Sequence, residues 1–120
     1  MKYNITEKQF KLFKKEVFKW QKKFGLINYH LEVVLDSFMT NDYFAMCEMD
    51  YRAKSARITM NDQWNIKPTK KLVKKYALHE VLELLLGRFN DLAFDRFVCA
   101  DNIEESKHHI IRVLENTLLK

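Results

Sequence analysis

The chain has 120 residues, of which 48% are hydrophobic and 31% are charged, with two glycines and one proline. This composition suits one domain, residues 1–120, and excludes a disordered, low-complexity or collagen-like chain. No run of about eighteen residues is free of charge, and the N-terminal segment lacks the apolar core of a signal peptide. We therefore expect a cytoplasmic protein that does not cross a membrane, with Cys47 and Cys99 as reduced thiols.

Positive charge is concentrated at the start of the chain. Residues 1–25 contain eight lysines and two glutamates, a net charge of +6, whereas the other thirteen basic and fourteen acidic residues nearly cancel. A basic face of this kind can attract nucleic acid. A solvated helix face that keeps the protein in solution is the more ordinary interpretation and the one we favour, and binding of nucleic acid through this helix is a third, weaker hypothesis.

The first predicted element is a helix that begins after Thr6. Thr6 and Gln9 have the spacing of a capping box. One apolar stripe follows at three- and four-residue spacing, formed by Phe10, Phe13, Val17, Trp20 and Phe24. Gly25 comes next, where a left-handed C-cap favours glycine, so the pattern predicts a helix of about five turns.

Three later segments have the two-residue period of β-strands. They are residues 28–36, 42–50 and 56–61, and the polar stretch at 50–55 is typical of a turn. His30 alternates to the polar face of the first strand, so we expect it to face solvent. Short strands joined in this way predict a three-stranded antiparallel meander whose apolar face is covered by the flanking helices.

Two more helices are predicted after the strands. Pro-Thr at 68–69 is typical of a helix start, and the helix over 70–86 is expected to end at Gly87. Its second half, ALHEVLELLL, is apolar on almost every side and is expected to be buried. A last helix is predicted from Asp101 or Asn102 onward. The expected fold class is thus α+β, with an N-terminal helix, the meander, a motif helix and a C-terminal helix.

Three polar side chains interrupt the apolar half of the motif helix. His79 and Glu83 are four residues apart and project from one face, with Glu80 beside them. A histidine nitrogen and a carboxylate oxygen one turn apart can bind a single metal ion at about 2 Å each. A neighbouring glutamate can then deprotonate a metal-bound water. The pattern H-E-x-x-E is thus a variant of the H-E-x-x-H motif of zinc peptidases, and the alternative is an ordinary core pair.

Several segments together resemble a known family, the short metallopeptidases encoded by phages, which are minimal zincin-like proteins. They are YHLEVV, CEMDYRAKSARITMN, ALHEVLELLL and HHIIRVLENTL. The resemblance covers most of the chain and implies a hydrolase of the host cytoplasm that binds zinc and acts on a peptide or protein. It implies His79 and position 83 as ligands, Glu80 as general base, and a third ligand from the last helix.

Position 83 departs from the family pattern, because Glu83 stands where histidine is usual. In one interpretation zinc is held by His79, Glu83 and a histidine of the last helix, for which His108 is preferred to His109; a His₂Glu set is known for catalytic zinc. In the other, Lys107 pairs with Glu83 and no metal binds. Lys107 lies within about 40° of the apolar stripe of the last helix, whereas His108 lies on its flank.

Glu104 and Glu105 are further candidate ligands, although their place in the first turn of the last helix predicts a capping role. The expected function is a zinc-dependent metallopeptidase-like phage or prophage protein that hydrolyses peptide bonds through a metal-activated water. An exposed strand edge beside the motif helix is expected to hold the substrate backbone. The alternative function is a metal-free, inactive relative that acts as a binding or adaptor module.

Overall fold

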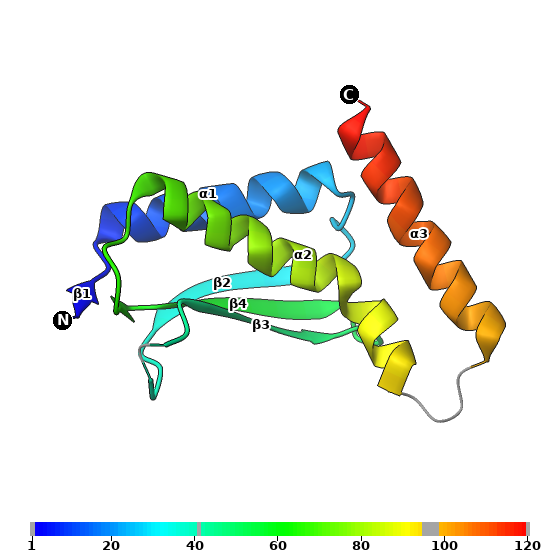
Figure 1. The fold of residues 1–120 in the computed structure, drawn as a ribbon, viewed down its shortest axis with the longest axis horizontal. Helices are drawn as coiled ribbons and strands as arrows, with labels where there is room; N and C mark the ends of the chain where they lie inside the picture. The colour runs from blue at the N-terminus through cyan, green and yellow to red at the C-terminus, as the bar shows by residue number, and fades with distance from the viewer. Residues whose placement is uncertain (1, 41, 95–98, 120) are drawn as a thin grey trace.

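The computed structural model describes residues 2–40, 42–94 and 99–119. Within them the helices are α1 (Glu7–Lys23), α2 (Lys70–Phe94) and α3 (Ala100–Leu118), and the strands are β1 (Tyr3–Asn4), β2 (His30–Asp36), β3 (Ala45–Asp50), β4 (Ser55–Asn61) and β5 (Gln63–Trp64). α1 and α2 pack side by side over one face of a sheet formed by β2, β3 and β4 (Figure 1). The expected α+β class is confirmed, with each predicted helix and strand region present.

The first helix forms as its sequence predicts. The Thr6 hydroxyl accepts a hydrogen bond from the Gln9 backbone N–H, and the Gln9 side chain accepts one from the Thr6 N–H, which completes the capping box. At the other end Gly25 has φ +70°, and the backbone N–H groups of Gly25 and Leu26 donate to the carbonyls of Lys22 and Gln21. These two bonds form a Schellman motif, which ends the helix where the glycine is placed.

The expected antiparallel meander is wrong in its strand order. The order across the sheet is β2-β4-β3, with β2 parallel to β4 and β3 antiparallel to β4. Only the β3–β4 hairpin is sequential, and the Asp50 carboxylate closes its turn by accepting hydrogen bonds from the N–H groups of Arg52 and Ala53. The two-residue period specifies which face of each strand is apolar, but it does not specify which strands are neighbours.

The ends of the last two helices also differ from the predictions. α2 does not end at Gly87 but continues to Phe94, and Gly87 is buried inside it. α3 begins at Ala100 rather than after Asp101 or Asn102. The Asn102 side chain accepts a hydrogen bond from the Cys99 N–H, so it takes the capping position expected for Glu104 or Glu105.

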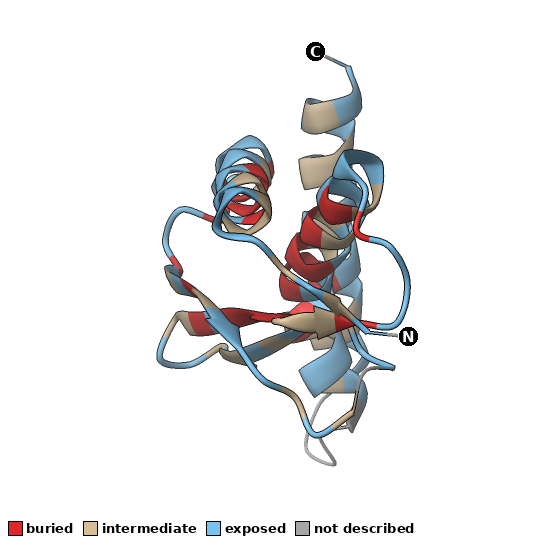
Figure 2. Cartoon of the chain, turned by 90° about the vertical axis from the view of Figure 1, so that its left-hand side faces the viewer, coloured by how far each residue is buried: buried red, intermediate tan, exposed pale blue. Residues whose placement is uncertain are grey.

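The core lies between the sheet and the helix pair, where buried residues face one another across the two layers (Figure 2). Trp64 is fully buried on β5, which pairs with β1 in a small second sheet. The largest buried residues of this core are Trp64, Phe13, Ile58, Met60 and Leu84. No helix within the described residues has both the length and the hydrophobicity needed to cross a bilayer.

Candidate functional site

The motif segment of α2 lies along β3. Tyr76 packs against Phe44 with ring centroids 4.8 Å apart. A second contact joins Gly87 to the side chain of Met49. Gly87 is eleven residues after Tyr76 on the helix, and Met49 is five residues after Phe44 along the strand. Eleven helical residues and five strand residues both span about 16 Å. α2 therefore runs in the same direction as β3 and in register with it, which places Glu80 and Glu83 near Cys47.

Glu80 faces into the interface between α2 and β3. Its side chain is almost wholly buried, and burial, with a smaller contribution from the Glu83 carboxylate, raises the pKa of the Glu80 carboxyl to about 7. Cys47 is half-buried on the facing strand, and burial raises the pKa of its thiol to about 12, with further contributions from the carboxylates of Glu80 and Glu83. This interface thus holds a carboxyl that exchanges its proton near neutral pH beside a thiol that stays protonated.

His79 and Glu83 lie on the outer side of α2 and contact each other. The distance from His79 Nε2 to Glu83 Oε1 is 3.5 Å, and both side chains are about 60% exposed. Lys74 marks the side of α2 that faces α1, because its Nζ lies 3.7 Å from Glu16 Oε1. Glu83 is nine residues from Lys74, which is about 180° around a helix, so Glu83 points away from α1.

α3 lies on the opposite side of α2 from Glu83. His109 of α3 shares a groove with Leu84, Leu85 and Arg88 of α2. Leu85 is within about 20° of Lys74 around the helix, so α3 packs on the side that faces α1. The Thr117 hydroxyl donates a hydrogen bond of 2.8 Å to the Val113 carbonyl of its own helix, and it lies 3.4 Å from the Lys23 carbonyl oxygen, so the end of α3 is next to the C-terminus of α1.

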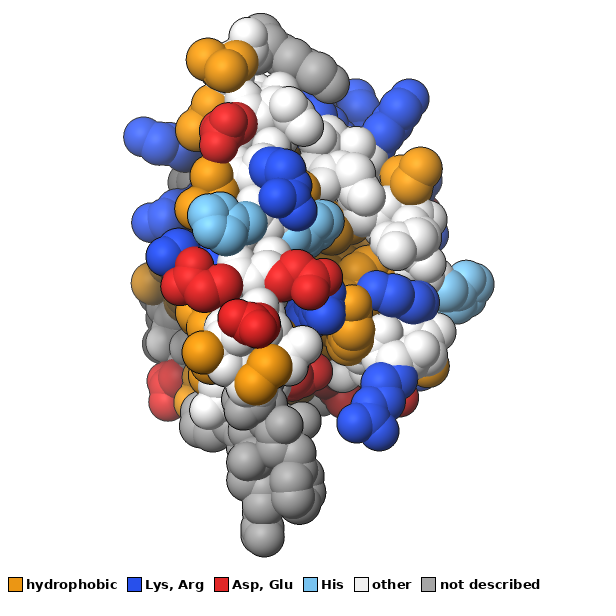
Figure 3. All heavy atoms as spheres, turned by 90° about the vertical axis from the view of Figure 1, so that its right-hand side faces the viewer, with side chains coloured by type: hydrophobic (Ala, Val, Ile, Leu, Met, Phe, Trp, Pro, Cys, Tyr) orange, Lys and Arg blue, Asp and Glu red, His pale blue; other side chains and the backbone are white. Residues whose placement is uncertain are grey.

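The predicted third ligands of α3 accordingly have partners within their own helix. His108 Nε2 lies 3.5 Å from Glu104 Oε2, and Lys107 Nζ lies 3.7 Å from Glu104 Oε1. Lys107 therefore pairs with Glu104, and the Lys107–Glu83 ion pair of the second interpretation is not formed. Figure 3 shows acidic and histidine side chains close together on the face that α3 forms.

The donors that the structure brings together do not make a complete zinc site. Catalytic zinc takes three protein ligands and a water. His79 and Glu83 supply two donors, and no group of three or more His, Cys, Asp or Glu side chains in residues 2–40, 42–94 and 99–119 is placed to hold a metal ion. The convergence of His79, Glu83 and His108 on one point is thus not found among the described residues.

One edge of β3 is open beside the motif. β3 pairs with β4 along one side over its whole length, and no other strand in the described part of the chain pairs with its second side. An open edge presents unpaired backbone N–H and C=O groups that can bind an extended chain. Because α1 lies on the other side of α2, the outward-facing Glu83 and His79 lie toward this open edge.

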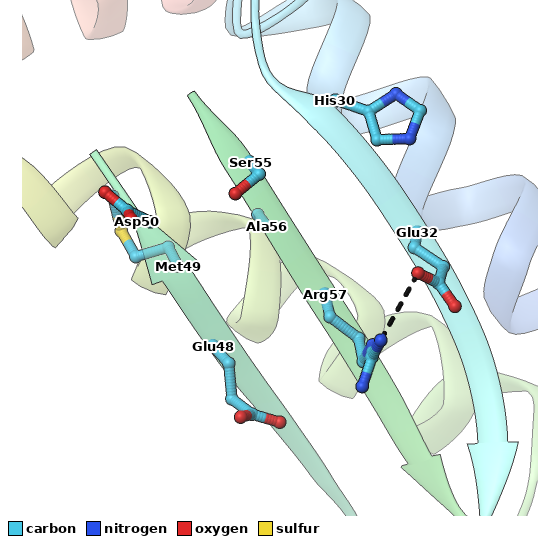
Figure 4. Close-up of a pocket in the computed structure, with 8 residues that line it drawn as sticks. All are labelled: His30, Glu32, Glu48, Met49, Asp50, Ser55, Ala56 and Arg57. Atoms are coloured by element: carbon cyan, nitrogen blue, oxygen red, sulfur yellow. Dashed lines mark ion pairs between the residues drawn. The ribbon is translucent and has the colours of Figure 1, made fainter. Parts of the chain in front are cut away.

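The face of the sheet turned away from the helices carries a second group of charged residues. Glu32 on β2 and Arg57 on β4 form an ion pair of 3.5 Å, with Glu48 on β3 and His30 nearby around a shallow hollow (Figure 4). His30 is exposed, as its alternation predicted. The pair spans the parallel strands β2 and β4, whose adjacency the sequence did not indicate.

Cys47 is the site residue that sequence reasoning missed. Its alternation with Met46 and Glu48 placed it on the inner face of a strand, but the strand's position under α2 was needed to bring it to Glu80. No protein-family model, curated protein or solved structure matches the chain in the comparisons that were made. The candidate site therefore rests on its own geometry.

Proposed function

We propose that this chain is a zincin-like peptide-binding protein that holds an extended peptide along the open edge of β3. The observation that carries the proposal is that the H-E-x-x-E segment of α2 lies beside β3, whose second edge pairs with no strand in the described part of the chain. A peptide added to that edge gains main-chain hydrogen bonds to β3. Its side chains then lie beside His79 and Glu83, whose exposed polar atoms can select among peptides.

The chemistry of the motif favours a peptide with a basic side chain at this point. Glu83 is exposed, and its carboxylate adds to the larger effect of burial in raising the pKa of Glu80. A lysine or arginine of the peptide would be attracted to both carboxylates and would relieve that repulsion. Binding of such a peptide is therefore expected to lower the pKa of Glu80.

The test is a nuclear magnetic resonance titration of the full chain with an array of overlapping peptides from denatured casein. Binding peptides are expected to shift the backbone amide signals of β3 and to leave those of β2 unchanged. Glu83→Lys should weaken binding of basic peptides about tenfold, which corresponds to about 1.4 kcal/mol. Glu115→Lys, the same change on the exposed side of α3, is the control. Shifts at β2, or equal losses in both variants, contradict the proposal.

Zinc-dependent hydrolysis of the bound peptide is the second candidate function. It is favoured by the contact between His79 and Glu83, which offer two zinc donors, and by Glu80, whose pKa of about 7 suits a general base at neutral pH. Bound zinc would supply a polarised water or carbonyl. The chain's own part would be to orient the peptide along β3 and to take up a proton on Glu80.

Zinc titration by calorimetry separates the two candidates. Hydrolysis requires stoichiometric zinc in the wild-type chain, loss of that zinc in His79→Ala, and casein cleavage that Glu80→Gln abolishes while zinc binding persists. Peptide binding that is unchanged by a chelator, with no stoichiometric zinc, supports the binding module and removes the peptidase.

A further inference from the structure

The lysines of α1 form one continuous stripe on its solvent side. Lys8, Lys11, Lys15, Lys19 and Lys22 are all exposed, and their spacing of three or four residues keeps them on one face. The opposite face of α1 is in the core, where Phe13 and Val17 are fully buried. The stripe therefore lies on the side of the helix layer that faces away from the sheet (Figure 2).

The start of α2 adds more lysines beside this stripe. Residues 63–79 contain five lysines and no acidic residue, while the residues outside 1–25 and 63–79 hold eight basic and fourteen acidic residues, a net charge of −6. Lys71, Lys74 and Lys75 are exposed on α2, which packs directly against α1. The sequence after residue 25 is nearly neutral as a whole, but it contains a basic segment, residues 63–79, and is acidic outside that segment.

Glu16 joins the two groups of lysines. This carboxylate is 6% exposed, and its two oxygens lie 3.2 Å from Lys19 Nζ of α1 and 3.7 Å from Lys74 Nζ of α2. Because Glu16 is buried between α1 and α2, it holds Lys19 and Lys74 close together across the seam, that is, the line of contact between the two helices. Lys15, Lys22, Lys71 and Lys75 form no ion pair within the described residues, so their charge is not neutralised.

A groove crosses the seam where the two helices begin. It has a volume of about 420 Å³, and Lys8, Lys70 and Lys74 line it with no acidic residue among them. The Gln9 side chain donates a hydrogen bond to the Pro68 carbonyl, which fixes the two helix starts relative to each other. An anionic group in this groove would lie among three lysine side chains from two packed helices.

We propose that this two-helix basic face, formed by the lysines of α1 and of residues 70–75, binds the phosphate backbone of nucleic acid. Lys8 and Lys22 are fourteen residues apart, about 21 Å along the helix, and duplex DNA carries a phosphate charge for every 1.7 Å or so of its axis. The face therefore meets several phosphates at once. Lysines are point charges and the face has no arginine, so binding is independent of base sequence.

An anionic membrane surface fits these residues less well. Helices that bind in the membrane interface bury an apolar face beneath their basic one. The apolar face of α1 is already used in the core, where Phe13, Val17 and Phe24 pack. The basic face offers charge without an apolar side to insert, which suits a hydrated polyanion.

Fluorescence anisotropy with a short labelled DNA duplex tests the proposal on the full chain. We expect a Kd of about 10⁻⁴ to 10⁻⁶ M near physiological salt, and a steep loss of affinity between about 50 and 200 mM salt. Lys15→Glu/Lys22→Glu on α1 and Lys71→Glu/Lys75→Glu on α2 should each weaken binding at least about tenfold. Each pair should also reduce the slope of log K against log salt by about two, since one phosphate contact contributes about 0.9.

Arg52→Glu/Arg112→Glu is the matched control. It lowers the net charge by the same amount from exposed sites on the β3–β4 turn and on α3, and it should change affinity by less than about threefold. Absence of binding at low salt overturns the proposal, as does a control that loses as much affinity as the face variants. An effect of the α1 pair without the α2 pair overturns the two-helix face. Binding to phosphatidylserine vesicles without binding to the duplex also overturns it.

Discussion

Gly87 of α2 lies directly against Met49 of β3, so closely that a β-carbon at position 87 would overlap the Sδ atom of Met49. The missing side chain lets the second half of α2 approach the strand. This contact, together with that of Tyr76 with Phe44, fixes the register that places Glu80 over Cys47. A glycine that signals a helix end in the sequence is thus used for close packing inside the helix.

Gly87→Ala is expected to destabilise the protein by about 1 kcal/mol or less, because the flexible side chain of Met49 has to move out of the way. Alanine favours a helix over glycine by up to about 1 kcal/mol, so a purely local effect would have the opposite sign. Urea denaturation measures the difference. The double variant Gly87→Ala/Met49→Ala should lose less stability than the two single variants predict together.

Glu80→Gln is expected to stabilise the protein at neutral pH. The folded-state pKa of Glu80 is raised from 4.5 to about 7, so between these values the folded chain holds a proton that the unfolded chain has released. The free energy of unfolding therefore falls as pH rises from 4.5 to 7, by roughly 2–4 kcal/mol in total. Below this range both states are protonated, and above it both are ionised with the full loss in place.

Urea titrations at pH 5 and pH 8 check this dependence. The wild-type chain should be less stable at the higher pH, and Glu80→Gln should remove most of the difference. Glu48→Gln, at an exposed position on the outward face of β3, should leave the difference unchanged. If the free energy of unfolding does not fall from pH 5 to pH 8, or if Glu80→Gln leaves its pH dependence unchanged, Glu80 is not buried as described.

The two cysteines are expected to react with iodoacetamide at very different rates. Thiolate is the reactive form, and a pKa of about 12 leaves about one part in ten thousand of Cys47 ionised at pH 8. Cys99 is exposed and should be modified first, with Cys47 slower by at least about a hundredfold. Peptide mass spectrometry follows both sites, and equal rates are expected only in denaturant. Equal rates in buffer would contradict the burial of Cys47.

Introducing the histidine of the H-E-x-x-H motif at position 83, with an acidic residue at position 107, should not create a tight zinc site. In Glu83→His/Lys107→Glu, position 83 gains the usual histidine, but residue 107 lies on α3, which packs on the other side of α2. We expect zinc binding to stay weaker than about micromolar by calorimetry, both in this double variant and in Glu83→His alone. Stoichiometric tight binding by the double variant alone would show that α3 can reach the motif face.

Local signals predicted the helices better than the sheet. The capping box at Thr6, the apolar stripe and Gly25 all act within a few residues of each other, so α1 follows from its sequence. The insertion of β4 between β2 and β3 depends on contacts between distant residues, and no local signal encodes it. The predicted end of α2 at Gly87 was wrong for the same reason, because the surroundings of Gly87 are formed by Met49, thirty-eight residues earlier in the chain.

The candidate site was partly accessible from sequence. Spacing on one helix correctly placed His79 beside Glu83. The apolar surroundings predicted a buried motif, but only Glu80 is buried, whereas the side chains of His79 and Glu83 are about 60% exposed. The helical periodicity of α3 indicates which face of α3 is buried. It does not indicate which side of α2 that face packs against. The relation of His108 to the motif therefore depended on the three-dimensional structure.

The central position of β4 has a consequence for the order in which the sheet can assemble. Every ladder of the three-stranded sheet includes β4, so β2 has no neighbour to pair with until the chain has been made as far as Asn61. During synthesis on the ribosome, α1 can form early, whereas β2 emerges as an unpaired strand that waits for a later one. Substitutions that weaken β4 should therefore slow refolding more than equally destabilising substitutions in α1.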